Sequence, residues 1–291
     1  GLLFAATSSF LFSICSLVAK CFGLNAAEIS CISFLGVVTL STPIAIFRCK
    51  RILPPRGYRF LFVARSITGT IFLICSFRSV QFIPLGDASV IFATTPILTL
   101  VLAKIFLREP CTLYNFVMIS VLMCGIILVT QPSMLTSGVE ASNNYFQGII
   151  YAVLASLSEA AGNIIVRKLK SFHFSIIMFN HGILSFFQTI FFLILTSAEK
   201  ITFTVSIPLA LLAFGTCCEQ LLVTLALSVE NAGPVALVQA SDIIYGYLFQ
   251  IFYFGEKIQF LPLLGALLII AVITHMAMHL RQELERHTTI I

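Results

Sequence analysis

The sequence predicts an all-α integral membrane protein with ten transmembrane helices, arranged as two inverted five-helix repeats. Of its 291 residues, 59% are hydrophobic and 10% are charged, and the mean hydropathy is +1.04. This leaves too little polar surface for a soluble globule of that size. Apolar runs long enough to cross a bilayer follow one another along the chain. One half of the sequence also matches the other half at a constant offset, which indicates a duplication.

A bilayer core takes about 20 apolar residues per helical crossing, so the chain has room for about ten crossings. Hydropathy places them at residues 2–22, 27–47, 58–80, 86–107, 111–130, 147–166, 172–196, 207–229, 234–254 and 260–280. A polar segment without Lys or Arg separates the fifth span from the sixth. We therefore predict a first repeat over residues 1–132, an extracytosolic linker over 133–146, and a second repeat with a short cytosolic tail over 147–291.

The duplication is clearest in the stretch from Pro84 to Glu109, which recurs in looser form from Asn231 to Glu256. An offset of 147 residues relates the two copies, and the same offset without a gap aligns the first and sixth spans. The matched pairs are Gly86 with Gly233, Ala93 with Ala240, Glu109 with Glu256, Gly1 with Gly148, Ala5 with Ala152, Ser9 with Ser156 and Lys20 with Arg167. One duplicated unit therefore builds the chain.

The two copies differ near their middles, and this difference predicts an asymmetric cavity. The first copy has Thr94, Thr95 and Pro96, where the second has Ser241, Asp242 and Ile243. Proline lacks a backbone donor, so we expect a kink in the first copy and none at Ile243. We expect Thr94, Thr95 and Ser241 to line the cavity. Tyr245 and Phe249 follow Asp242 at helical spacing and would pack on a ligand, or else face lipid or the core.

The distribution of basic residues predicts the orientation. If the first span starts in the cytosol, cytosolic connections hold twelve Lys and Arg residues and the opposite connections hold four. The positive-inside rule then places both termini in the cytosol. Because five spans is an odd number, the second repeat crosses in the opposite sense to the first. Inverted repeats are typical of secondary transporters, whose halves rock around a central site; a duplicated membrane protein that moves nothing is the alternative.

Motifs at the ends of the fourth and ninth spans resemble those of a known family. The sequence reads LREP at Leu107–Pro110 and FGEK at Phe254–Lys257, and GEKIQFLPLLGALLIIAVI follows from Gly255 to Ile273. These motifs resemble the EamA-type drug/metabolite transporter superfamily. Among animal members, the chain is most similar to the family 35 solute carriers, subfamily G. The resemblance implies a ten-span carrier, of nucleotide sugars in much of family 35 and of organic anions in subfamily G.

The first half departs from the family pattern, because Arg108 replaces the glycine before Glu109 and Met118 stands where Gly265 would be matched. Glu109 and Glu256 correspond to the motif carboxylates. Each is at the end of a span, so we expect it to bond a helix end or a loop.

Charges inside spans are energetically unfavourable, so they are usually paired or functional. The first half supplies the cations Lys20, Arg65 and Arg78. A guanidinium offers a planar fork of donors that matches a carboxylate or phosphate, so we expect these three residues to bind an anionic substrate. The alternatives are snorkelling to the headgroups for Lys20 and Arg78, and an ion pair with Glu159 or Glu219 for Arg65.

The second half supplies carboxylates. Glu159 and Glu219 each lie about twelve residues into their spans from the same side, at a depth of about 18 Å, and Asp242 lies two turns into the ninth span. Carboxylates at this level can carry protons, or can neutralise the arginines and hold the repeats in register. His181 either relays the same proton or hydrogen-bonds a neighbouring helix.

Other functional classes lack support in the sequence. His275 and His279 have the i, i+4 spacing of two metal ligands, but no third ligand pattern accompanies them, so we predict neither a metal nor a cofactor. No nucleophile motif, P-loop or catalytic carboxylate cluster occurs, so we do not expect an enzyme. No nucleic-acid-binding pattern occurs either.

These observations together predict a secondary active transporter of a small organic anion, such as a di- or tricarboxylate like citrate, working by alternating access with possible proton coupling. One alternative is a nucleotide-sugar or nucleotide antiporter that holds the base with Tyr245 or Phe249. Another is a non-transporting scaffold that binds proteins through the basic segment from Arg48 to Arg59. We expect a monomer or homodimer in the lipid bilayer of the plasma membrane or the endoplasmic reticulum.

Overall fold

The computed structural model describes residues 1–22, 26–48, 53–83, 85–109, 113–131, 143–196, 207–253, 255 and 260–289. The described residues are predominantly helical, at 91%, and contain no strand. This agrees with the predicted all-α class. Residues 132–142, which make up most of the predicted linker, and Glu256 lie outside the described residues.

Helices occupy all ten predicted spans. Their bounds are α1 (Leu2–Phe22), α2 (Ala26–Arg48), η1 (Arg56–Tyr58), α3 (Arg59–Phe82), α4 (Leu85–Phe92), α5 (Thr95–Leu102), η2 (Ala103–Leu107), α6 (Leu113–Thr130), α8 (Asn143–Lys168), α9 (Phe174–Thr196), α10 (Ile207–Val229), α11 (Ala232–Gln239), α12 (Asp242–Phe252) and α13 (Phe260–Thr289). The predicted ends differ from these by a few residues for most spans. The clearest exception is α13, which continues to Thr289 instead of ending at residue 280.

Eight helical segments of the described chain are long and apolar enough to cross a membrane. The other two predicted spans are helical as well. The apolar part of α1 is the shorter stretch Leu2–Val18, and the ninth predicted span consists of two short helices, α11 and α12. A multi-pass membrane protein follows from these eight segments alone.

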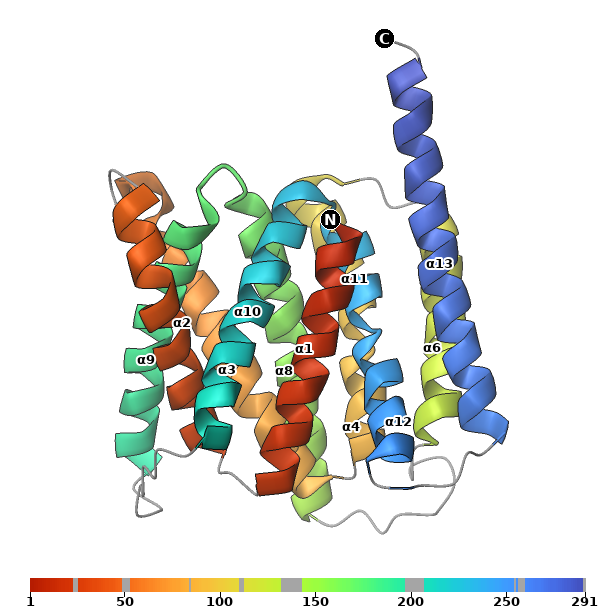
Figure 1. Ribbon diagram of the computed structural model, residues 1–291, viewed down its shortest axis with the longest axis horizontal. Coiled ribbons are helices and arrows are strands. Elements are labelled where there is room, and N and C mark those ends of the chain that lie inside the picture. The colour runs from red at the N-terminus through yellow and green to blue at the C-terminus, as the bar shows by residue number, and fades with distance from the viewer. Residues whose placement is uncertain are drawn as a thin grey trace.

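The helices run side by side as one bundle (Figure 1). α2 and α9 pack together at one edge, and α6 and α13 pack together at the opposite edge. Between these edges, α3 packs along α8, and α1 packs along α10. The first residues of α1 and the last turns of α13 lie at the same end of the bundle (Figure 1).

The two stretches that match at an offset of 147 residues are both broken helices. α4 gives way to α5 after a turn at Ala93 and Thr94, and α11 gives way to α12 after a turn at Ala240 and Ser241. The offset of 147 makes the two turns equivalent. The expectation of a break in the Pro96 copy alone is therefore wrong. The second copy turns without proline, because the Ser241 N–H donates to the Val238 carbonyl three residues back, at 3.0 Å.

A serine from the other half of the chain bonds each break. The Ser9 hydroxyl donates to the carbonyl of Gln239, at 2.9 Å, and the Ser156 hydroxyl donates to the carbonyl of Ile91, at 3.1 Å. Ser9 and Ser156 are themselves equivalent under the offset. The Ile91 carbonyl also accepts the N–H of Thr94, at 3.0 Å. The two serine bonds tie each broken helix to the other half of the chain.

α6 and α13 meet at a pair of glycines. A Cβ atom added to Gly265 would overlap the carbonyl oxygen of Gly125, so no side chain fits there without movement of the backbone. Small residues allow this close approach between membrane helices. We expect Gly265→Ala to lower the free energy of unfolding by about 1–3 kcal/mol, as overpacking does elsewhere.

The matched control for this substitution is Gly246→Ala on α12, where nothing lies within 4 Å of an added Cβ atom. Alanine should be neutral or slightly stabilising there, since it favours helix over glycine. Thermal unfolding of the two purified variants measures the difference. Equal melting temperatures would contradict the close packing at Gly265.

Candidate functional site

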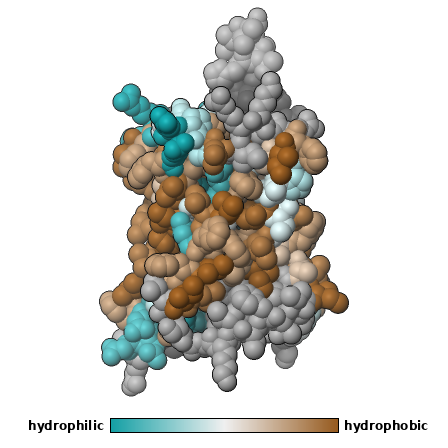
Figure 2. Space-filling view, turned by 90° about the vertical axis from the view of Figure 1, so that its left-hand side faces the viewer, coloured by the Kyte–Doolittle hydropathy of each residue, from teal (hydrophilic) through white to brown (hydrophobic). Residues whose placement is uncertain are grey.

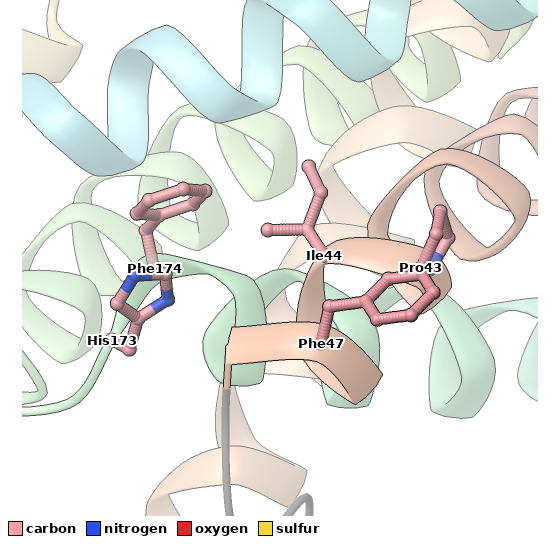
Figure 3. A pocket seen from close by; sticks show the side chains of 5 residues that line it. All are labelled: Pro43, Ile44, Phe47, His173 and Phe174. Carbon is pink, nitrogen blue, oxygen red and sulfur yellow. The ribbon is translucent and has the colours of Figure 1, made fainter.

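A wide apolar hollow lies at one edge of the bundle, between α2 and α9. Its volume is about 600 Å³, and its lining residues are Pro43, Ile44, Phe47, His173 and Phe174 (Figure 3). Phe47 is 84% exposed, and this side of the molecule is largely hydrophobic across its middle (Figure 2). Binding sites for small polar solutes combine an enclosed shape with convergent polar groups, so this hollow is a poor candidate.

A polar cavity between the two halves is the candidate site. It has a volume of about 80 Å³, and its lining includes Arg65 from α3, Glu159 from α8, Glu219 from α10 and Asp242 from α12. An adjoining cavity of about 60 Å³ shares Glu159 and Asp242, and adds Thr95 from α5. Four charged residues that lie on four different helices, and that the sequence singled out, thus line the same cavity.

Arg65 is the cation of this cavity and is only 8% exposed. Its Nη2 donates to Oε1 of Gln220 at 2.8 Å, and Nε2 of Gln220 donates to a carboxylate oxygen of Glu219 at 3.0 Å. The alternative ion pair with Glu159 or Glu219 is not formed, because no carboxylate of the described residues lies within 4.0 Å of the guanidinium.

The guanidinium keeps donors free for a further partner. Within the described chain, Nε of Arg65 is buried without a hydrogen bond. Gly162 of α8 makes room for the group, since a Cβ atom there would lie 2.9 Å from Nη1 of Arg65. A buried donor without an acceptor is destabilising, so this fork is suited to a ligand that brings a carboxylate.

Amide side chains complete the polar wall, and they were missed by the sequence analysis. They are Gln220, Asn163 and Gln239. Nδ2 of Asn163 donates to Oε1 of Gln239 at 3.3 Å, which joins α8 to α11. A signal for Asn163 was present, because it lies one turn after Glu159 and therefore shares its helix face. Uncharged Gln220 and Gln239 carried no comparable signal.

The three hydroxyl residues predicted to line the cavity differ in their contacts. The Thr95 hydroxyl donates to Oε2 of Glu159 at 3.3 Å, whereas the Thr94 hydroxyl donates to the carbonyl of Ile91 at 2.7 Å. Ser241 is buried, and its hydroxyl has no hydrogen-bond partner in the described chain. Of these three, only Thr95 lines a cavity.

The remaining predicted residues lie elsewhere. Tyr245 and Phe249 pack against Phe10, with ring centroids 5.2 and 6.3 Å away, and line neither polar cavity. Arg78 lies on α3 outside both linings. Lys20 belongs to α1, but its side chain lies outside the described residues.

The histidines are held by neighbouring helices. His181 is buried against Phe34 of α2 and shares a hydrogen bond of 3.2 Å with the hydroxyl of Ser185. His275 shares a hydrogen bond of 2.8 Å with the hydroxyl of Tyr114, whose ring stacks on His279 at 4.4 Å. No group of three potential metal ligands comes together among the described residues.

A second ionic centre closes one end of the bundle. Nε of Arg167 lies 3.1 Å from Oε1 of Glu109, and both side chains are largely buried. Nη1 of Arg167 donates to the carbonyl of Leu227 at 3.0 Å, and Nη2 donates to Oδ1 of Asn231 at 2.8 Å. Oε2 of Glu109 accepts the N–H of Ala232 at 3.0 Å, which confirms its expected role at a helix end. The centre joins α8, the segment that follows η2, α10 and the first residue of α11.

Comparisons with known proteins agree with this architecture. Residues 1–131 match the EamA-like transporter family. The whole chain is also similar to curated transporters. It is 28% identical over 280 residues to solute carrier family 35 member G1 of Homo sapiens, covering 93% of this chain and 77% of that protein. The predicted resemblance to the EamA superfamily and to subfamily G is confirmed.

A bacterial transporter is similar over nearly the full length. The pseudopaline exporter CntI of Pseudomonas aeruginosa is 26% identical over 282 residues, covering 93% of each chain. A protein of known crystal structure shares the fold with a TM-score of 0.79, at 12% identity and over 94% of this chain and 96% of that one. These findings support a multi-pass membrane transporter, which is consistent with the prediction that the chain is not an enzyme.

Proposed function

We propose that this EamA-like chain is a secondary active transporter that carries a small organic anion through the polar cavity by alternating access. The observation that carries the proposal is the buried Arg65 guanidinium, which lines the cavity, forms no ion pair within the described chain and has an unbonded Nε. Di- and tricarboxylates such as citrate are the first anions to test, because a carboxylate matches the guanidinium fork.

The proposal includes ten spans in two inverted five-span repeats. Helix packing supports it. In two five-span repeats, α3 of the first repeat corresponds to α10 of the second, and α1 corresponds to α8. The α3–α8 contact therefore corresponds to the α10–α1 contact, and both contacts are extensive. The same offset exchanges the two breaks and the two serines that bond them. Both termini would lie in the cytosol, on the side where Lys and Arg predominate.

Movement is part of the proposal because the cavity is small. A volume of about 80 Å³ holds a few water molecules, whereas ligand sites generally measure about 300 Å³ or more. The cavity must therefore widen before it accepts a citrate-sized anion. The Arg167–Glu109 centre holds one end of the bundle together, and rocking of one repeat against the other would open that end.

The direct test is transport by the purified chain in proteoliposomes. Labelled citrate, malate and glutarate are offered in parallel, with nucleotide sugars as unlabelled competitors. We expect saturable uptake of at least one carboxylate above protein-free vesicles, without competition by nucleotide sugars. Absence of uptake for every labelled anion contradicts the proposal. Strong competition by a nucleotide sugar favours the antiporter alternative, for which Tyr245 and Phe249 lie outside the cavity lining.

Proton coupling is the second part of the proposal. The cavity wall holds three carboxylates and one guanidinium, so an anion binds more readily when protons neutralise some of the carboxylates. We expect uptake to rise several-fold when the outer solution is more acidic than the lumen. Glu219→Gln should remove most of this dependence, because the amide cannot exchange a proton. Wild-type uptake that does not respond to a pH gradient contradicts coupling.

A further inference from the structure

The polar wall of the cavity has an aromatic counterpart at equivalent positions of the first repeat. Under the offset of 147, Glu159 corresponds to Phe12, Glu219 to Phe72 and Gln239 to Phe92. All three phenylalanines line the same cavity as their polar equivalents. Repeats that place equivalent residues around one cavity have their pseudo-twofold axis close to it. The cavity therefore has a polar wall, and a second wall, the aromatic wall, in which the three rings lie beside Arg65, Ser8, Ser9 and Ser76.

Two rings of the aromatic wall lie next to each other. The rings of Phe12 on α1 and Phe72 on α3 lie with centroids 6.4 Å apart and planes at 31°. Phe92, the last residue of α4, also lines the adjoining cavity and links the two spaces. A stripe of phenylalanines on a membrane helix usually faces lipid or other helices, but these three border a space that also contains three carboxylates and an arginine.

The charged and the aromatic side chains that would bind the ligand have a definite spacing along α3. Arg65 and Phe72 are separated by seven residues, which puts them on the same helix face about 10 Å apart. A ligand whose carboxylate meets the guanidinium would thus place its far end beside Phe72. A polyanion such as citrate has charged groups along its whole length, and would bury one of them against the phenylalanine rings, which offer no hydrogen-bond donor.

We infer that the preferred substrate of the proposed transporter is an amphipathic carboxylate, with an acid group for Arg65 and a flat apolar group, such as an aromatic ring, for Phe12, Phe72 and Phe92. This inference rests on the proposed function and narrows its substrate class. The apolar group gains by leaving water, and ring-on-ring contact adds to that gain. The amide and carboxylate groups of the opposite wall are available for any polar edge of the ligand.

Ligand-dependent thermal stabilisation of the purified chain tests the inference with 3-phenylpropionate, glutarate and citrate. We expect 3-phenylpropionate to reach half-maximal stabilisation at a concentration at least 10-fold lower than glutarate or citrate. Phe72→Ala should reduce this preference about 10-fold, a usual effect of losing apolar contact in a binding pocket. The matched control is Phe191→Ala on α9, which removes a phenylalanine that is 64% exposed and lies outside the cavity lining, and leaves the preference unchanged.

Phe72→Leu and Phe12→Ala cover the case in which Phe72→Ala does not fold, and either should also reduce the preference. Equal or stronger stabilisation by glutarate or citrate overturns the inference. A preference for 3-phenylpropionate that survives all of the folded cavity variants also overturns it. If either of these two results is found and citrate is still taken up into proteoliposomes, the proposed function stands and only the inference fails. If no anion is transported, both fail.

Discussion

Arg65→Ala is expected to lower anion uptake by about 100-fold at equal amounts of reconstituted protein. Loss of charge-assisted hydrogen bonds in a water-poor site removes about 3 kcal/mol of binding free energy, and each 1.4 kcal/mol is about a factor of ten. The substitution also leaves Gln220 without its 2.8 Å donor. Initial rates of labelled-anion uptake into proteoliposomes, over a range of anion concentrations, measure the effect.

Two further variants make this result specific. Arg78→Ala removes the same side chain from the same helix outside the cavity lining, so its uptake should stay within about twofold of the wild type, as for most surface changes. Arg65→Lys keeps the charge but loses the planar fork, and should fall between the wild type and Arg65→Ala. If Arg65→Ala transports as well as Arg78→Ala, the anion binds somewhere else.

Arg167→Ala is expected to lower the free energy of unfolding by about 3–5 kcal/mol, because it leaves Glu109 as an unpaired, largely buried carboxylate. The same substitution removes the donors of the Leu227 carbonyl and the Asn231 side chain. Unfolding in mixed micelles with increasing SDS measures the change. Lys168→Ala, at the next and exposed position of α8, is the control and should have little effect.

A double variant separates the ion pair from the rest of the junction. Removal of Glu109 and Arg167 together leaves no unpaired charge, so the combined loss should be smaller than the sum of the two single losses. Strict additivity would show that the two side chains do not stabilise one another. Near-wild-type stability of Arg167→Ala alone would contradict the closed junction.

The positions of the helices could be predicted from the sequence, because helix formation in a membrane depends on nearby residues of the chain. A membrane span must satisfy its own backbone hydrogen bonds, so a long apolar run is sufficient to predict a helix. The breaks were harder to predict. Pro96 marks one of them, but the break at Ala240 and Ser241 has no proline, and Ser9 from the other half of the chain bonds the carbonyl at Gln239. Sequence alone does not reveal a partner 230 residues away.

The candidate site also combines residues that the sequence predicted with residues that it did not. Arg65, Glu159, Glu219 and Asp242 could be named in advance, because a charge within a span is rare enough to attract attention. Gln220 could not, since glutamine carries no such signal, yet its amide lies between Arg65 and Glu219 and replaces the ion pair considered for Arg65. Tyr245 has the right spacing after Asp242 but packs against Phe10.

By itself, the sequence determined the helical class and the positions of the helices, because the length of an apolar run is a property of the chain read in one dimension. The constant offset of 147 residues is such a property too, and it predicts the duplication. Only the tertiary structure decided which side chains meet. The rotation of each helix and its packing against helices of the other repeat placed Phe12 and Phe72 around the same cavity as Glu159 and Glu219. Those rotations arise from contacts between distant segments, which no local pattern specifies.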